Sequence, residues 1–505
     1  MKKDSIIFLA LVGILLGLSQ TFVFLLPVVI FAYFKFLKNI LRENSIKRSV
    51  FKGWIFGVGF FLGSMHWIIS PFLIFERHFA ISPISIFFPL LMGFFFCIPA
   101  FFLAITNKFS SCFRKNHIFF QSWIMGTFFI FPELLRSFIW GGLPFNLTAH
   151  IWAFNEEFIQ ISKFIGVFGL SFLTLVWIGF LSFCIMRNEK WKLLFATFFF
   201  PVFLFSFNFV SKEKFENGHE IFTRVVQPNI SQKEKWNKLL FQRNFEKLLS
   251  LTIKKNSSKK EKIIIWPEVA LTFYLNEEKD LIAYLRKKIP DNTTIVTGGL
   301  RRVFSNKNFK VYNTLYVIDK ENFTFYDKKK LVPFGEFMPL RGFLNLFKLT
   351  PGSTDFEKGE QENQIRIIYE ESELFFEPSI CYEAIFQTFG AEESSIMINI
   401  TNDAWFGYTT GPRQHLAAQI FRSVEKSVFF LRSANSGISV ALDSSGKILK
   451  RIELGDEGYF DLKIKPLIST TPFEKYGNLL LFLSIISLCL LFCLIEFLFS
   501  LKRKH

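Results

Sequence analysis

Long apolar runs dominate the first 210 residues of the chain and return after residue 475. A membrane-spanning helix needs about 20 mainly apolar residues, and eight runs come close to that length. We therefore predict eight transmembrane helices, at about 5–19, 21–36, 53–75, 82–106, 119–138, 158–186, 193–210 and 477–499. A signal peptide is the alternative for Lys2, Lys3 and the run that follows. No small-residue cleavage pattern comes after that run, so a retained helix is favoured.

Residues 211–475 follow a different pattern. Short apolar runs such as Ile263–Trp266 and Leu374–Ile380 have the length and composition of buried β-strands. Helical periodicity appears between them, near 237–255, 277–289 and 412–427. The alternation predicts an α/β sandwich domain. We expect three parts: a seven-helix membrane domain (1–210), this α/β domain (211–475), and a last helix with a basic tail (476–505).

The net charge of +17 is best explained by the topology of the chain. Basic residues near the ends of membrane helices stay on the cytoplasmic side, so their positions indicate the orientation. With the N-terminus inside, the inner segments carry 17 Lys or Arg and three acidic residues, and they are residues 1–4, 35–52, 107–117, 187–192 and 501–505. This predicts cytoplasmic termini and an α/β domain on the outer, periplasmic face of a bacterial inner membrane. About +3 remains elsewhere, so no large basic surface is expected for nucleic acid.

Cys381 is the only cysteine between residues 211 and 475, so it has no disulfide partner within that region. It directly follows the strand-like run Leu374–Ile380. A lone thiol at a strand end is a candidate nucleophile. A small apolar side chain packed in the core is the open alternative.

Two other polar residues supply what a thiol nucleophile needs, which is a base and a cation or amide dipoles for the oxyanion. Glu268 ends the apolar run Ile263–Trp266, where an apolar setting favours a general base; a solvated or helix-capping Glu is the alternative. Lys328 begins a run of three lysines before Leu331–Glu336. Three consecutive lysines are typical of a solvated turn. The alternative is that the apolar residues after them pack against the sheet and direct one lysine inward.

The segments around these residues resemble the nitrilase superfamily, in which Glu, Lys and Cys occur in this chain order. They resemble more closely the apolipoprotein N-acyltransferase family, a membrane-embedded branch with a nitrilase-like domain before the last of eight helices. The resemblance implies a helical membrane domain plus an α-β-β-α sandwich. The segments that carry it are Glu133–Arg136, Gly141–Phe145, Val226–Asn229, Lys235–Trp236, Trp266–Glu268, Tyr312–Leu315, Lys328, Leu331–Glu336, Ile380–Glu383, Thr401–Gly407, Gly411–His415 and Leu431–Gly437.

The resemblance also implies a reaction. An acyl chain leaves the sn-1 ester of a phosphatidylethanolamine-like phospholipid, forms a thioester with Cys381, and passes to the α-amine of a lipoprotein's diacylglyceryl-cysteine, with ping-pong kinetics. Glu268 would be the base, while Lys328 and the Tyr382 backbone N–H would hold the oxyanion. A membrane-tethered nitrilase-type amidase that gives the acyl group to water is the alternative, and a non-catalytic membrane scaffold is the second.

Supporting roles follow from the resemblance alone. Glu336 and Glu383 would hold Lys328 and the cysteine loop in place, and Trp236, Asn313 and Tyr382 would line the pocket beside the thioester. Each also has a plain structural explanation: a turn cap for Glu336, core packing for Trp236 and a strand-end hydrogen bond for Asn313.

Four further residues are candidates for contact with lipid. Phe343 and Phe347 lie in a segment too apolar for an ordinary exposed loop, which suggests an arm that dips into the membrane; core packing is the alternative. Trp405 would form a second lip. Arg136 lies three residues after Glu133 near a predicted helix end, where it would form an ion pair or contact a lipid phosphate.

The histidines and cysteines show no zinc-type spacing, and no glycine-rich phosphate loop follows a predicted strand. We therefore expect neither a metal nor a cofactor. A triad complete within one chain requires no partner subunit, so a monomer is expected.

Overall fold

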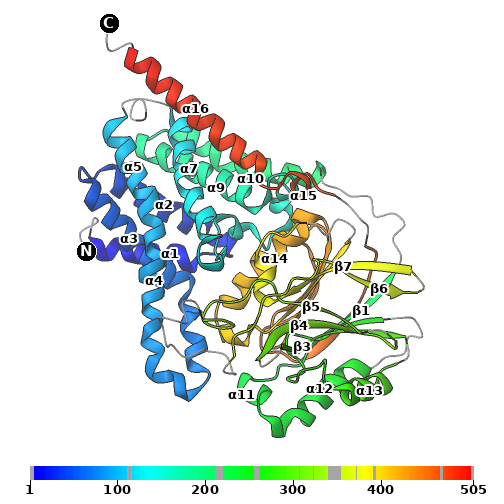
Figure 1. Cartoon of the computed structure of the whole chain (residues 1–505). Helices are drawn as coiled ribbons and strands as arrows, with labels where there is room; N and C mark the ends of the chain where they lie inside the picture. Colours follow the sequence, from blue (N-terminus) through cyan, green and yellow to red (C-terminus); the bar gives the residue numbers. More distant parts are fainter. Residues whose placement is uncertain are drawn as a thin grey trace. The chain divides into compact units, whose positions relative to one another are not determined.

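The computed structural model describes residues 5–110, 113, 117–210, 220–254, 262–290, 292–305, 308–321, 323–338, 354–370, 372–389, 394–466 and 470–501. The chain divides into two compact units. The first comprises Met1–Ile68, Pro83–Lys212 and Thr471–His505, and the second comprises Ile69–Ser82 and Glu213–Thr470. Figure 1 shows the helices of the first unit and the strands of the second.

The first unit is helical. Its helices are α1 (Ile6–Leu18), α2 (Leu26–Leu41), α3 (Ile46–Ser64), α4 (Phe87–Met92), α5 (Cys97–Phe109), α7 (Ile118–Arg136), α8 (Glu156–Ile159), α9 (Ser162–Arg187), α10 (Lys190–Val210), α15 (Pro472–Tyr476) and α16 (Leu479–Leu501). Helices α1 and α3 approach closely through glycines four residues apart on each. A Cβ atom at Gly13 would lie 2.3 Å from the Phe56 carbonyl oxygen, and one at Gly17 would lie 2.2 Å from that of Phe60. Small residues at this spacing are typical of helix pairs packed in membranes.

Five helical segments in the described residues are long and apolar enough to cross a membrane, or six if the bent pair Ile46–Ser64 and His66–Leu73 is counted as one span. The apolar helices Ile6–Leu18 and Leu479–Leu491 are shorter. Helix α3 ends at Ser64, before the predicted end at residue 75, and the chain continues in 3-10 turns that contain Pro71 and Pro83. Proline lacks the N–H that a continuing α-helix requires.

The second unit contains two six-stranded sheets. The first has the order β12-β1-β2-β3-β4-β5 and the second β11-β10-β9-β8-β7-β6. The strands are β1 (Ile221–Gln227), β2 (Lys262–Ile265), β3 (Thr293–Ser305), β4 (Asn308–Ile318), β5 (Phe323–Asp327), β6 (Ile365–Tyr369), β7 (Ser372–Ile380), β8 (Ile396–Thr401), β9 (Phe429–Ala434), β10 (Ser439–Leu442), β11 (Ile448–Ile452) and β12 (Gly458–Ile464). Strands β1, β2 and β3 are parallel, as are β7, β8 and β9.

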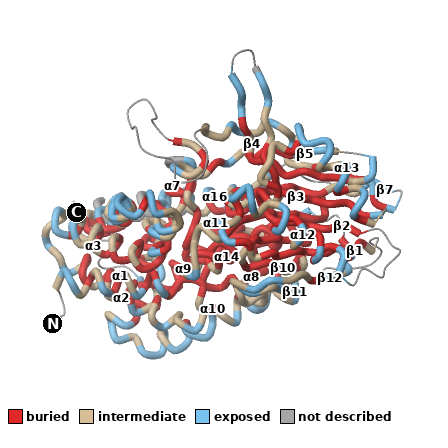
Figure 2. The backbone as a smooth tube through the Cα atoms, turned by 90° about the horizontal axis from the view of Figure 1, so that it is seen from below, coloured by how far each residue is buried: buried red, intermediate tan, exposed pale blue. Residues whose placement is uncertain are grey.

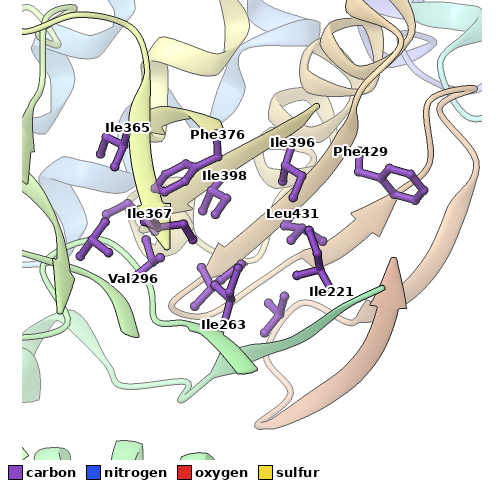
Figure 3. Packing of buried hydrophobic residues seen from close by; sticks show 14 of the residues in the cluster. Ile221, Ile263, Val296, Ile365, Ile367, Phe376, Ile396, Ile398, Phe429 and Leu431 are labelled. Carbon is purple, nitrogen blue, oxygen red and sulfur yellow. The ribbon is translucent and has the colours of Figure 1, made fainter. Parts of the chain in front are cut away.

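The main core lies between the two sheets. Ile263 and Val296 of the first sheet and Ile398 and Leu431 of the second belong to one buried cluster, and Figure 3 shows these side chains side by side. Most of each sheet is buried (Figure 2). Branched apolar residues at alternate positions of facing strands are what such an interface requires.

Helices cover the outer faces of the sheets. Helices α12 (Phe241–Ile253) and α13 (Lys279–Lys288) pack on the first sheet in a second buried cluster that includes Phe245 and Trp266. Helix α14 (Gly411–Lys426) is almost wholly buried, and its Lys426 forms an ion pair with Glu377 of β7 in the second sheet. The unit is therefore a four-layered α-β-β-α sandwich.

Candidate active site

The three predicted catalytic residues follow the carboxyl ends of strands. Glu268 comes shortly after β2, Lys328 directly after β5 and Cys381 directly after β7. Strand β5 pairs with β4 and β4 with β3, both antiparallel, so β5 runs in the direction of β2 and β3 and ends at the same edge. That edge is where ligands bind in many α/β folds. The charges of Glu268 and Lys328 both act on the pKa of Cys381, which is consistent with the three residues lying at one edge.

Two turns at this edge have unusual backbones. Cys381 has a φ of 52°, a left-handed conformation that is uncommon for a residue other than glycine, and it leads from β7 into the 3-10 helix η8 (Cys381–Ile385). After β2, Glu268 lies against Gly298 of β3. A Cβ atom on that glycine would come within 2.7 Å of the Glu268 Cα and 2.2 Å of the Val269 nitrogen, so glycine is required there.

Buried polar contacts connect Glu268 to Lys328. Asn313 donates through Nδ2 to Oε1 of Glu268 at 2.7 Å and to Oε1 of Glu336 at 2.9 Å. The Nζ of Lys328 donates to the same Glu336 oxygen at 2.9 Å and lies 3.6 Å from Oε1 of Glu268. All four side chains are buried. Two carboxylates therefore share one amide and one ammonium, which fixes the geometry of the base and the cation.

The pKa shifts define the resting charges. Burial by itself lowers the pKa of Lys328, but the carboxylates of Glu336 and Glu268 outweigh it and hold that pKa well above its ordinary value. Burial raises the pKa of the Cys381 thiol, and Glu268 raises it further, while Lys328 opposes them only in part. The site thus rests with a charged lysine and a neutral thiol, so attack by sulfur requires a base that takes its proton.

Glu383 joins the cysteine turn to the lysine turn. Its Oε2 accepts from the Ile380 backbone N–H at 2.8 Å, before Cys381. Its Oε1 accepts from the Lys329 N–H at 2.6 Å and the Lys330 N–H at 3.1 Å, after Lys328. The buried side chain of Glu383 therefore fixes the cysteine turn relative to the lysine turn.

The other predicted site residues differ in their burial and in their hydrogen-bond partners, and two of them are not described by the structure. Trp236 caps α11 (Gln232–Lys235) and is half-buried, and its Nε1 has no hydrogen-bond partner among the described residues. Tyr382 is buried beside Cys381, and Trp405 is half-buried in the 3-10 helix η9 (Asp403–Phe406). Phe343 and Phe347 lie outside the described residues.

Arg136 belongs to the first unit, where it ends α7. It donates to the Phe145 carbonyl at 2.5 Å, whereas Oε1 of Glu133 accepts from the backbone N–H and hydroxyl of Thr148 at 3.0 and 2.6 Å. Arg136 and Glu133 thus have separate partners, and both line a small cavity. Gln20 also lines it, and its Oε1 has no partner among the described residues.

Comparisons with known proteins cover the whole chain. Residues 12–181 match the profile described as apolipoprotein N-acyltransferase N-terminal domain, and residues 223–471 match that of carbon-nitrogen hydrolase. The apolipoprotein N-acyltransferase of Rickettsia typhi is 32% identical over 97% of this chain and 98% of its own length. The chain belongs to the apolipoprotein N-acyltransferase family. The Rickettsia prowazekii member is also 32% identical, over 99% of this chain and all of its own, and the Caulobacter vibrioides member is 29% identical over 85% and 83%.

Membership in the apolipoprotein N-acyltransferase family makes this protein an acyltransferase of the carbon-nitrogen hydrolase superfamily that acts on lipid and lipoprotein substrates. Together with the apolar helices, it also makes the chain a bacterial membrane protein. Among solved structures, a glutamine-dependent NAD+ synthetase from Acinetobacter baumannii matches 52% of this chain and 50% of its own, at 14% identity and a TM-score of 0.34.

Sequence reasoning assigned no role to a buried network next to Cys381. Asp403, which follows β8, forms an ion pair with Arg432 and hydrogen bonds with Thr401 and with Nδ1 of His415, both at 2.9 Å. The Nε2 of His415 lies 3.3 Å from the Cys381 carbonyl oxygen. Burial alone raises the pKa of Asp403, but Arg432 and His415 outweigh it and lower that pKa. The signal was present, because Asp403 follows a mainly apolar strand as Glu268 does.

Lys235 was also missed. Its ammonium donates to the backbone carbonyl of Glu268 at 2.8 Å, from the end of α11. A lysine next to Trp236 in a polar helix gives no periodic signal for burial, so its place in the site came from the structure. In the described residues there is no cluster of three His, Cys, Asp or Glu that could hold a metal ion.

Proposed function

We propose that this family member works through Glu268, Lys328 and Cys381 in two acyl-transfer steps. In the first, Cys381 attacks the sn-1 ester carbonyl of a phosphatidylethanolamine-like phospholipid while Glu268 takes the thiol proton. The Lys328 ammonium and the Tyr382 backbone N–H stabilise the oxyanion. When the C–O bond breaks, Glu268 returns the proton to the leaving oxygen. The products are a lysophospholipid and an acyl thioester on Cys381.

In the second step, the free α-amine of a diacylglyceryl-cysteine at the start of a lipoprotein attacks the thioester. Glu268 takes the proton of the amine, the C–S bond breaks, and the proton passes to the Cys381 sulfur. One ester is exchanged for one amide, and the enzyme returns to its starting state. Because one product leaves before the second substrate reacts, the kinetics are ping-pong.

The observation that carries this proposal is the buried contact chain from Glu268 through Asn313 and Glu336 to Lys328. It holds a buried carboxylate near a buried ammonium, and the charges of both act on the pKa of the Cys381 thiol, which supports the three roles. A neutral thiol beside a carboxylate favours proton transfer during attack, and a buried ammonium favours the oxyanion that follows.

Membrane placement completes the proposal. We infer eight spans, both termini in the cytoplasm, and residues 211–475 as a catalytic domain on the outer face of the inner membrane, between a membrane domain at 1–210 and a last helix with its tail at 476–505. The positive charges of the inner segments support this orientation. A site at the bilayer surface also keeps water from the thioester. The protein acts as a monomer because the triad is complete within one chain.

Lipid-binding roles complete the assignment. Arg136 binds the phosphate of the phospholipid. It is buried and lines a cavity, and among the described residues its side chain donates to the neutral Phe145 carbonyl and lies over the Phe61 ring. Trp236 and Trp405 line the acyl chain, and the unpartnered Trp236 N–H supplies a donor. Phe343 and Phe347 form an apolar arm that guides lipid, a prediction that rests on sequence alone.

Mass spectrometry of the reaction products tests the proposal. Purified protein is incubated with phosphatidylethanolamine and a diacylated lipopeptide. We expect lysophospholipid and triacylated lipopeptide in equal amounts. Free fatty acid in place of acylated lipopeptide would identify a hydrolase, and a Cys381→Ala variant that still acylates the lipopeptide would contradict the triad.

A further inference from the structure

Lys235 is a buried lysine whose hydrogen-bond partner is neutral. It is 6% exposed, and its Nζ donates to the backbone carbonyl of Glu268 at 2.8 Å. Other buried lysines of the second unit pair with carboxylates: Lys328 with Glu336, and Lys426 with Glu377. Burying an ammonium is costly unless it is paired. A buried ammonium that donates to a neutral carbonyl therefore contributes little to the stability of the fold. This points to a role for Lys235 in the active site.

The position of Lys235 suggests what that role is. It holds the turn after β2, where Val269 has a φ of 44° and the Glu268 backbone lies against Gly298. Glu268 and Cys381 both raise the pKa of Lys235, against the lowering effect of its burial. The ammonium thus fixes the main chain of the general base and adds positive charge beside the pair that exchanges a proton.

We propose that Lys235 is a positioning residue for acylation of Cys381, holding Glu268 in place through its carbonyl and stabilising the negative charge that develops as sulfur attacks. This inference rests on the proposed function and adds a residue to it. Lys235 touches neither substrate nor the reacting atoms in this role, since it acts through Glu268 and through its charge.

The charged surroundings of Cys381 make the role testable by pH. In the described part of the chain, the titratable groups around it include Lys235 in α11, Glu268 after β2, Lys328 after β5, Asp403 after β8 and His415 in α14. Burial lowers the pKa of Lys235 to about 8, against the raising effect of Glu268 and Cys381. The pKa of Lys328 is raised, so that residue keeps its charge at this pH. Acylation should therefore weaken as the pH rises past about 8.

The experiment follows the first step alone, because the lipoprotein amine titrates in the same range. Lysophospholipid released in a single turnover from phosphatidylethanolamine micelles, without acceptor, is measured from about pH 6 to 10. The variants are Lys235→Met, Lys235→Arg and Cys381→Ala. Lys262→Met is the matched control, because Lys262 is equally buried but pairs with Asp461.

We expect Lys235→Met to slow acylation about 10- to 100-fold at pH 7, the cost of a small displacement of a catalytic group. We expect Lys235→Arg, which stays charged, to keep its rate above pH 8, where the unchanged protein and Lys262→Met both slow down. A Lys235→Met rate within about twofold of the unchanged protein would overturn the inference.

The inference would also be overturned if the acylation rates of Lys235→Arg and the unchanged protein fell in the same way above pH 8. This comparison remains decisive even if Lys235→Met fails to fold. Failure of the proposed function looks different. If Cys381→Ala releases lysophospholipid at the rate of the unchanged protein, the proposed triad is contradicted. If Cys381→Ala releases none and Lys235→Met releases it at the unchanged rate, only the role of Lys235 is contradicted.

Discussion

The Nζ of Lys328 lies 3.6 Å from Oε1 of Glu268, with both side chains almost wholly buried. This distance is too long for a strong hydrogen bond, and each group instead has its shorter contact elsewhere. Asn313 donates to Glu268 and Lys328 donates to Glu336. The carboxylate of Glu268 therefore remains available to accept a proton, and the ammonium remains available for an oxyanion.

Replacing Glu268 with Gln should lower the rate of lysophospholipid release about 100- to 10,000-fold, the usual contribution of a general base. The amide keeps the size of the side chain but cannot take the Cys381 proton. A single-turnover assay with phosphatidylethanolamine measures the rate, and thermal unfolding checks that the fold is intact. A folded variant with an unchanged rate would remove Glu268 from the mechanism.

Glu336→Gln should destabilise the second unit by about 3–5 kcal/mol, because one partner of a buried ion pair is lost. Among the carboxylates near Lys328, Glu336 raises its pKa the most. The variant should therefore lower the pKa of Lys328, reduce the fraction of lysine that is charged, and slow acylation. Thermal unfolding and lysophospholipid release measure the two effects. The exposed Glu360→Gln is the control and should change neither. Unaltered stability of Glu336→Gln would show that the lysine does not depend on this carboxylate.

Asp403→Asn should destabilise the protein at neutral pH and lose its effect in acid. The pKa of Asp403 is lowered in the folded protein, so its charge stabilises the fold above the unfolded value of about 3.9. That stabilisation disappears as the pH falls through the folded pKa. Unfolding of both proteins at pH 7 and near pH 3 measures the gap. An equal gap at both values would argue against a charged Asp403.

Arg136→Gln should raise the KM for phospholipid and leave turnover of a small soluble ester nearly unchanged. A lost hydrogen bond to a charged group costs about 1.5–3 kcal/mol, or roughly 10- to 150-fold in affinity. Steady-state kinetics with both substrates give the comparison, and Arg48→Gln, on an exposed residue, is the control. An equal loss with both substrates would indicate a structural role for Arg136.

Strand ends were the reliable signal in this sequence. Glu268 and Cys381 each follow an apolar strand, and the family resemblance supplied Lys328 from a lysine run that looks like a solvated turn. The sandwich followed from short apolar runs, because their length and β-branched residues indicate buried strands. The network of Asp403 and His415 could be suspected from the same rule, since Asp403 follows β8.

Other features depended on contacts between distant segments. The burial of Lys235 comes from the approach of α11 to the turn after β2, more than 30 residues later, which no local pattern encodes. The end of α3 at Ser64 was missed because the apolar run continues past it, and Pro71 and Pro83 keep the following residues in 3-10 turns.

The mass of the intact protein after incubation with phosphatidylethanolamine alone tests the central claim most directly. We predict an increase equal to one acyl chain, located on Cys381, released by hydroxylamine as a thioester is, and lost on addition of diacylated lipopeptide as the lipopeptide gains the same mass. Acylation of the lipopeptide with no acyl group on Cys381 at any time, or at full rate by Cys381→Ala, would contradict it.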